Sequence, residues 1–203
     1  RVRSSAASDV YKRQVVLPFM YYETYGDDSL IRKYYNGMRR YIDYMTTRAN
    51  DGIVSFGLGD WYDYGDFRAG FSRNTPVPLV ATAHYYMVVR YLVEAARMLD
   101  NRYDVAYYTH LGEEINKAFH REFYHKDTRQ YGTGSQCSNA LPLFLGMVPA
   151  EDKQAVLDNL VADIKRHGNR LTTGDVGNRY LFQTLARNGL NEPVSYTHLR
   201  AHE

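Results

Sequence analysis

The segment Gly57–Asp66 (GLGDWYDYGD) concentrates the residue types that most readily recognise a sugar. It holds three aspartates, three aromatic residues and three glycines, and its Trp61 is the only tryptophan among 203 residues. An aromatic ring offers an apolar face to the C–H side of a pyranose, and a carboxylate accepts hydrogen bonds from hydroxyl groups. The segment therefore predicts a carbohydrate-binding loop. The alternative is a loop between helices whose aspartates cap helix ends and whose rings fill a local core.

A second acidic position lies in a later glycine-containing segment. Asp175 stands between Gly174 and Gly177, and a loop there could bring its carboxylate to the same sugar pocket. The same residue could equally cap a helix that begins near Asn178. Both interpretations of Asp175 remain open from the sequence.

Other reactive side chains do not form a recognisable site. The aspartates of the Gly57–Asp66 loop are three residues apart, which is not the spacing of a calcium loop. His120 and His125 lack the helical zinc-binding pattern, and His84 is expected to be a hydrogen-bonded core residue. Cys137 is the only cysteine, so neither a disulfide framework nor a cysteine zinc site is expected. We expect no metal and no cofactor.

The two ends of the chain differ from its body. Residues 1–14 and 194–203 lack hydrophobic periodicity and resemble translated sequencing-adaptor sequence, so we expect both to be non-native. They hold five of the 25 lysines and arginines and two of the 23 acidic residues, which leaves 20 basic and 21 acidic residues between them. That balance gives no reason to expect a nucleic-acid partner. No apolar run reaches membrane-spanning length, so no membrane segment is expected either.

Residues 15–193 are enough for one domain or for part of a larger one. Apolar residues recur at helical spacing in six segments, and a short hairpin is expected around Tyr124–Gly132. Glycine ends two of the helices at Gly168 and Gly189. The predicted helices are Asp28 or Ser29 to Asn50, Pro76 or Pro78 to Asp100, Asp104 to Phe119, Ser135 to Leu145, Glu151 to His167 and Asn178 to Asn188.

Long loops alternate with short turns in this series, which predicts a chain of αα-hairpins. The long loops are Asp51–Thr75, His120–Gly134 and Gly168–Gly177. If consecutive helices are antiparallel, loops separated by two helices emerge at the same end. All three loops are therefore predicted to share one face, where they could build a site on a rigid scaffold.

Three motifs in this order resemble the catalytic domain of bacterial α-L-rhamnosidases. They are GLGDWYD at residues 57–63, YGTGSQCSNA at 131–140 and LTTGDVGNRY at 171–180. The resemblance covers residues 15–193 and implies an incomplete (α/α)6 barrel of the six-hairpin glycosidase type. It also implies an inverting glycoside hydrolase, whose two carboxyl groups stand about 6.5 to 9.5 Å apart.

The resemblance further implies where the functional residues lie. The general-acid and general-base glutamates of the family fall before and after this chain, so no catalytic residue is expected within it. Asp60 and Trp61 match the family's pocket residues, with the indole against the C6 methyl of a rhamnose. Asp63 and Asp175 are weaker candidates for substrate binding, and for Asp63, as for Asp66, support of the loop is the favoured role. The implied partner is a rhamnose-containing glycoside or polysaccharide.

Two other classes of protein remain possible from the sequence. A helical carbohydrate-binding or scaffold domain could use the same pocket without turnover. A glucuronyl hydrolase or a lyase on the same barrel is a more remote alternative. We expect the isolated chain to be catalytically inert and poorly stable, because an open barrel exposes apolar helix faces. Oligomeric state and cellular location are left open.

Overall fold

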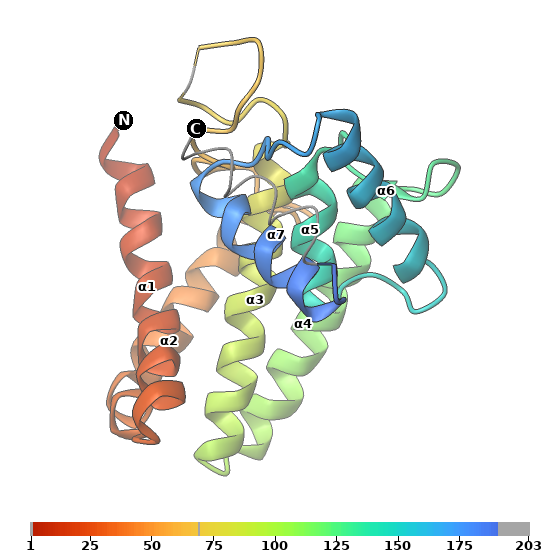
Figure 1. Cartoon of the computed structure of the whole chain (residues 1–203). Helices are drawn as coiled ribbons and strands as arrows, with labels where there is room; N and C mark the ends of the chain where they lie inside the picture. Colours follow the sequence, from red (N-terminus) through yellow and green to blue (C-terminus); the bar gives the residue numbers. More distant parts are fainter. Residues whose placement is uncertain (1, 69, 191–203) are drawn as a thin grey trace.

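The computed structural model describes residues 2–68 and 70–190, with only the backbone described for residues 2–13. This part of the chain is helical apart from one short β-hairpin (Figure 1). The elements are α1 (Val2–Tyr25), α2 (Ser29–Arg48), α3 (Val77–Met98), α4 (Arg102–Phe123), β1 (Tyr124–His125), β2 (Gln130–Tyr131), α5 (Gln136–Leu145), α6 (Lys153–Arg166) and α7 (Asp175–Arg187). The predicted all-α fold is confirmed.

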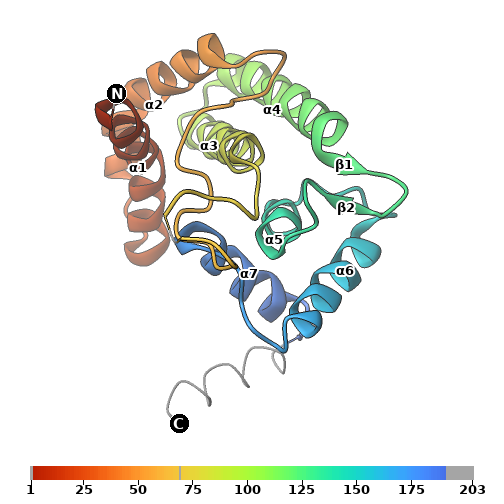
Figure 2. The same ribbon diagram turned by 90° about the horizontal axis from the view of Figure 1, so that it is seen from above.

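The helices form two layers of αα-hairpins. Figure 2 shows α2, α4 and α6 around the outside, with α3 and α5 within the arc that they make. Each outer helix packs against an inner one, and α3, α5 and α7 follow one another in contact. Helical hairpins stacked side by side in this way make part of an α/α barrel, as predicted.

Helix α5 lies deepest in the molecule, and its composition explains why. All of its residues except Phe144 are buried. Its C-terminal half is apolar, whereas its first turn carries the buried polar residues Gln136, Ser138 and Asn139. Buried polar groups require hydrogen-bond partners, and these three reach the loops at one end of the barrel. The start of α5 is therefore a fixed point for those loops.

The predicted helix boundaries are confirmed where local chemistry sets them. The Ser135 hydroxyl accepts a hydrogen bond from the N–H of Ser138 and caps α5. The helix continues through Pro142 to Leu145, as predicted. Gly168 and Gly189 follow α6 and α7 with φ of 66° and 70°. Glycine adopts this left-handed conformation without steric cost, which is why it ends helices.

Two features differ from the sequence prediction. Helix α1 was not predicted, because its first half was set aside as non-native and Pro18 interrupts the pattern of the rest. Helix α7 begins at Asp175, three residues earlier than expected, with Gly174 as its N-cap. Asp175 is the first residue of the helix and not its N-cap, so the N-cap interpretation of this residue is wrong. Residues 191–203 lie outside the described part, and the non-native assignment of both ends stays a prediction.

The prediction that the long loops share one face is confirmed. The segments before α3, before α5 and before α7 all lie at the end of the molecule opposite the α3–α4 turn (Figure 1). Hydrogen bonds tie them together. The N–H of Tyr64 donates to the carbonyl of Thr172 at 3.1 Å, and the hydroxyls of Thr75 and Ser135 are 2.7 Å apart.

Candidate functional site

Asp60 fastens the Gly57–Asp66 loop to the beginning of α7. Its side chain is fully buried, and its carboxylate accepts hydrogen bonds from the backbone N–H groups of Gly174 at 2.8 Å and Gly177 at 2.6 Å. The first N–H groups of a helix have no partner within the helix, and the helix dipole favours an anion there. The Asp60 carboxylate thus occupies the anion site of α7, although Gly174 lies 114 residues further along the chain.

The glycines of the later motif make this contact possible. A Cβ atom on Gly174 would lie 2.2 Å from the carbonyl oxygen of Trp61, and one on Gly177 would lie 2.7 Å from the Asp60 carboxylate. Both distances are far below van der Waals contact. The backbone N–H of Asp175 donates to the same Trp61 oxygen at 2.8 Å. Gly174 and Gly177 are therefore required because the Gly57–Asp66 loop lies too close to the start of α7 for a side chain. Backbone conformation is not the reason, since neither glycine has a positive φ.

Burial controls the protonation of the two reactive groups beneath the loop. Burial raises the pKa of Asp60 above its ordinary value, although the hydrogen bonds from Gly174 and Gly177 act in the opposite direction. Burial also raises the pKa of the Cys137 thiol well above its ordinary value, and the neighbouring Asp60 carboxylate adds to this effect. Since the thiolate is the nucleophilic form of cysteine, Cys137 is inert at neutral pH.

Asp63 closes the same loop on itself. One oxygen of its buried carboxylate accepts hydrogen bonds from the backbone N–H groups of Arg73 at 2.8 Å and Asn74 at 2.6 Å. The other oxygen, Oδ1, is buried and makes no hydrogen bond to any residue that the structure describes. Asp63 therefore joins the two ends of residues 63–74, the segment that directly follows Trp61 and Tyr62.

Trp61 lies in an aromatic cluster that is open to solvent. The indole packs edge-on against Tyr62, at 5.4 Å between ring centroids, and against Phe71, at 5.2 Å. Tyr62 is 48% exposed and Phe71 is 72% exposed, while Trp61 itself is half-buried. Large exposed rings are costly in water, and a cluster of them is typical of a surface that binds a ligand.

The four predicted substrate-binding residues thus occupy two levels. Trp61 and the exposed Asp175 are neighbours at the surface, joined by the backbone hydrogen bond described above. Asp60 and Asp63 lie beneath them and bind backbone amides. Asp66 is exposed and lines a separate pocket. The assignment of Asp60, Trp61, Asp63 and Asp175 to substrate binding stays a prediction.

Gln136 is a positioning residue that the sequence analysis missed. Its buried side-chain amide donates to the carbonyl of Arg170 at 3.0 Å and accepts from the N–H of Thr172 at 2.9 Å. It therefore fixes the segment between α6 and α7 to the start of α5. The sequence feature that could have pointed to this role is a glutamine directly after the serine that caps the helix. At that position a side chain lies near the loops at the start of the helix.

The remaining candidate residues have structural partners. The ring nitrogens of His84 lie 2.8 Å from the carbonyl of Val80 and 3.0 Å from the Tyr180 hydroxyl, so the prediction of a hydrogen-bonded core histidine is confirmed. His120 Nδ1 lies 3.1 Å from the Tyr131 hydroxyl. Within residues 14–68 and 70–190, no group of three or more histidine, cysteine or acidic side chains could hold a metal ion. Among the described residues, no helix has the length and apolar character needed to span a membrane.

The hairpin layers, with an aromatic and acidic loop fastened across one end, define part of a six-hairpin glycosidase domain. Residues 11–203 match the family described as the bacterial alpha-L-rhamnosidase 6 hairpin glycosidase domain. The chain belongs to this family.

Curated relatives agree with the family match. The chain is 30% identical over 199 residues to an alpha-L-rhamnosidase of Formosa agariphila, which covers 93% of this chain and 20% of the relative. It is 28% identical over 177 residues to an alpha-L-rhamnosidase of Streptomyces avermitilis, covering 86% of this chain and 16% of the relative. The chain therefore spans about a fifth of the length of the curated relatives that it matches.

Solved structures share the fold. The alpha-L-rhamnosidase from Dictyoglumus thermophilum superposes with a TM-score of 0.84 at 32% identity, covering 89% of this chain and 21% of that one. The Streptomyces avermitilis alpha-L-rhamnosidase complexed with L-rhamnose gives a TM-score of 0.80 at 26% identity, covering 89% of this chain and 17% of that one. The helical layers of this chain are thus those of a rhamnosidase domain.

Proposed function

We propose that this chain is the middle part of the catalytic domain of an α-L-rhamnosidase, whose full-length protein hydrolyses terminal α-L-rhamnosyl linkages. Family membership supports the proposal, and the observation that carries it is the aromatic loop that Asp60 holds across the end of the barrel. A loop fixed at both ends presents its rings in one arrangement, which lowers the entropic cost of binding a sugar.

The proposed reaction is an inverting hydrolysis that uses two carboxyl groups. A protonated carboxyl donates its proton to the glycosidic oxygen as the bond from the anomeric carbon to that oxygen breaks. A carboxylate on the opposite side removes a proton from water, whose oxygen bonds to the anomeric carbon with inverted configuration. We propose that both groups are glutamates outside this chain. In support, every glutamate that the structure describes is exposed, and none lies in the loops Asp51–Thr75 and Gly168–Gly177 that carry the candidate site residues.

Within this chain, the proposed contribution is recognition of the terminal rhamnose. The exposed edge of the Trp61 cluster offers an apolar wall to the C6 methyl, which replaces the hydroxymethyl group of an ordinary hexose. The exposed carboxylate of Asp175, next to Trp61, is placed to accept hydroxyl hydrogen bonds. Asp60 and Asp63 contribute by holding the loop, because backbone amides already occupy their carboxylates.

The lone tryptophan makes this proposal directly testable. L-Rhamnose added to the chain should change the fluorescence of Trp61, and L-mannose, which differs by a hydroxyl on C6, should bind more weakly. A Trp61→Ala variant should lose rhamnose binding measured by calorimetry, whereas Tyr103→Ala, at an exposed position on α4, should retain it. Equal binding of L-rhamnose by both variants would contradict the role of Trp61.

The alternative is a carbohydrate-binding domain without turnover, and the exposed aromatic cluster suits it equally well. The two proposals differ in what the surrounding protein does. A full-length rhamnosidase should release rhamnose from a synthetic α-L-rhamnoside, and proton NMR should show the inverted anomer first. Binding without hydrolysis by the full-length protein would favour the alternative.

A further inference from the structure

A pocket lies beside the aromatic loop, where residues 64–67 of the loop line it and Trp61 does not. Its volume is about 710 Å³, which is large enough for a sugar ring. The residues that line it come from the loop before α3, the turn before α5 and the end of α6, and they include Tyr64, Phe67, Asn74, Thr133, Asp163 and His167. None of these side chains was assigned to substrate binding at the surface around Trp61.

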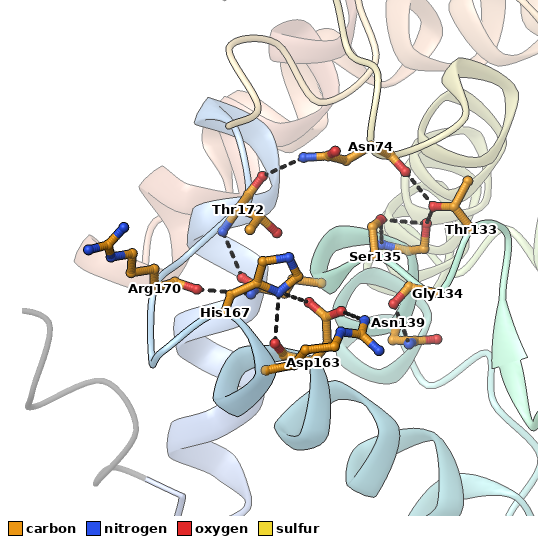
Figure 3. A network of polar contacts seen from close by, with 12 residues as sticks. Asn74, Thr133, Gly134, Ser135, Asn139, Asp163, His167, Arg170 and Thr172 are labelled. Atoms are coloured by element: carbon orange, nitrogen blue, oxygen red, sulfur yellow. Dashed lines mark hydrogen bonds and ion pairs between the residues drawn. The ribbon is translucent and has the colours of Figure 1, made fainter. Parts of the chain in front are cut away.

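Hydrogen bonds between distant segments hold the pocket walls in place (Figure 3). The side-chain amide of Asn74 donates to the carbonyls of Tyr64 at 2.7 Å and Thr172 at 3.2 Å. The Thr133 hydroxyl in turn donates to the carbonyl of Asn74. Because three segments are cross-linked through one asparagine, the pocket is formed before any ligand arrives, which reduces the cost of binding.

His167 is held in a fixed orientation at the pocket. Its Nδ1 lies 2.9 Å from the backbone carbonyl of Asp163 and 3.2 Å from the Asp163 carboxylate. The hydrogen bond to the Asp163 carbonyl, which can only accept, fixes the proton on Nδ1 and leaves Nε2 for other partners. The Asp163 carboxylate is itself buried and paired with Arg166, and its Oδ2 makes no conventional hydrogen bond to any residue described. In Figure 3 the His167 ring rises from Asp163 toward Asn74 and Thr172.

The chemistry of the lining matches a neutral pyranose. Tyr64 is 64% exposed and offers an aromatic face, and Phe67 also lines the pocket. The imidazole, the hydroxyls and the carboxylate of Asp66 can each pair with a sugar hydroxyl. The charges at the pocket balance, because Arg170 lines it together with Asp66 and Arg166 pairs with Asp163, which suits a neutral sugar.

We propose that this pocket binds a neutral pyranose unit that is linked to the terminal rhamnose, with Tyr64 against its apolar face and His167 Nε2 hydrogen-bonded to a hydroxyl. The inference rests on the proposed function, since it assigns the terminal rhamnose to the surface at Trp61. Tyr64 follows Trp61 by three residues on the same hydrogen-bonded loop, which brings the two proposed sugar positions onto one loop. The pocket would then contribute to the choice among rhamnosides.

The test uses the 203-residue chain with two probes, L-rhamnose and α-L-rhamnosyl-(1→6)-D-glucose. Trp61 fluorescence reports the first position, and the imidazole NMR signals of His167, assigned with a His167→Gln variant, report the second. We expect L-rhamnose to change the Trp61 signal alone and the disaccharide to change both. Tyr64→Ala should weaken disaccharide binding by about tenfold, which corresponds to the contribution of one stacked aromatic ring, and should leave L-rhamnose binding unchanged.

Tyr103→Ala is the matched control, because Tyr103 is also exposed, at 76%. It lies in the first turn of α4, and the α3–α4 turn is at the end of the molecule opposite the loops (Figure 1). A disaccharide that changes the Trp61 signal but not that of His167 would overturn the second pocket and leave the proposed function intact. Equal disaccharide affinities of Tyr64→Ala and Tyr103→Ala would do the same. If L-rhamnose leaves Trp61 unchanged, the proposed function itself fails.

Discussion

Replacing Asp60 with alanine tests the central structural argument, that one buried carboxylate holds the aromatic loop to α7. The change removes both acceptors of the N–H groups of Gly174 and Gly177. Each buried N–H left without a partner costs about 1 to 3 kcal/mol, which gives about 2 to 6 kcal/mol for the pair. Removing a buried charge recovers part of this cost, as the raised pKa of Asp60 indicates. We therefore expect a loss of about 3 kcal/mol.

The assay is urea unfolding of the 203-residue chain at low temperature, followed by Trp61 fluorescence. A loss of about 3 kcal/mol corresponds to a decrease in the urea midpoint of about 1 to 3 M for a slope of about 1 to 3 kcal/mol per M. Asp60→Asn keeps one acceptor and should lie between the wild type and the alanine variant. Asp66→Ala is the control, because Asp66 is exposed on the same loop, and exposed substitutions usually change stability by less than about 0.5 kcal/mol.

The result that would refute the reasoning is a free energy of unfolding for Asp60→Ala within about 0.5 kcal/mol of that for Asp66→Ala. In that case the hydrogen bonds to α7 would contribute nothing net. A broad transition of the wild-type chain itself would agree with the expected poor stability of an open barrel. The comparison would then need the full-length protein.

Three further predictions follow from the same contacts. Burial raises the pKa of Asp60 in the folded chain, so ionising Asp60 costs more in the folded than in the unfolded state, and wild-type stability should fall as the pH rises from about 4 through the raised value. Asp60→Asn cannot ionise at this position and should lack this decrease in urea unfolding, and a rise in wild-type stability relative to Asp60→Asn over that range would contradict the assigned shift. Gly177→Ala should lower the free energy of unfolding by about 1 to 3 kcal/mol, because its Cβ would clash with the Asp60 carboxylate. Gly37→Ala is the control in the same urea assay: a Cβ on Gly37, inside α2, would meet no atom within 4 Å, so the free energy of unfolding should rise by about 0.5 to 1 kcal/mol. Leu17 and Met20 are exposed on one face of α1, at 54% and 40%, so replacing both with glutamine should reduce self-association in sedimentation experiments, and unchanged association would place the contact elsewhere.

Much of the fold could be predicted from the sequence because its causes are local. Helical spacing of apolar residues located α2 to α7, and the Ser135 cap and the glycines after α6 and α7 set three of their ends. The alternation of long loops with short turns predicted that the loops would meet at one end. These features depend on residues within a few positions of one another, and such interactions are visible in a linear sequence.

Three ordered motifs predicted where the candidate site lies, but the contacts of their residues depended on tertiary structure. The sequence favoured Asp60 as a sugar ligand because a carboxylate beside an indole fits that chemistry. Its actual partners are backbone N–H groups 114 and 117 residues away. Every residue except proline carries such a group, so no sequence pattern marks which ones a buried carboxylate will meet.

The sequence by itself determined the all-α fold class, the order of the predicted helices and the position of the loop that carries Trp61. Only the tertiary structure decided which acidic residues lie at the surface and which lie beneath it. It also brought Asn74, Thr133 and Thr172 together around a pocket. The physical reason is that side-chain burial and hydrogen bonding between distant loops depend on how the helices stack, whereas helix formation depends mainly on neighbouring residues.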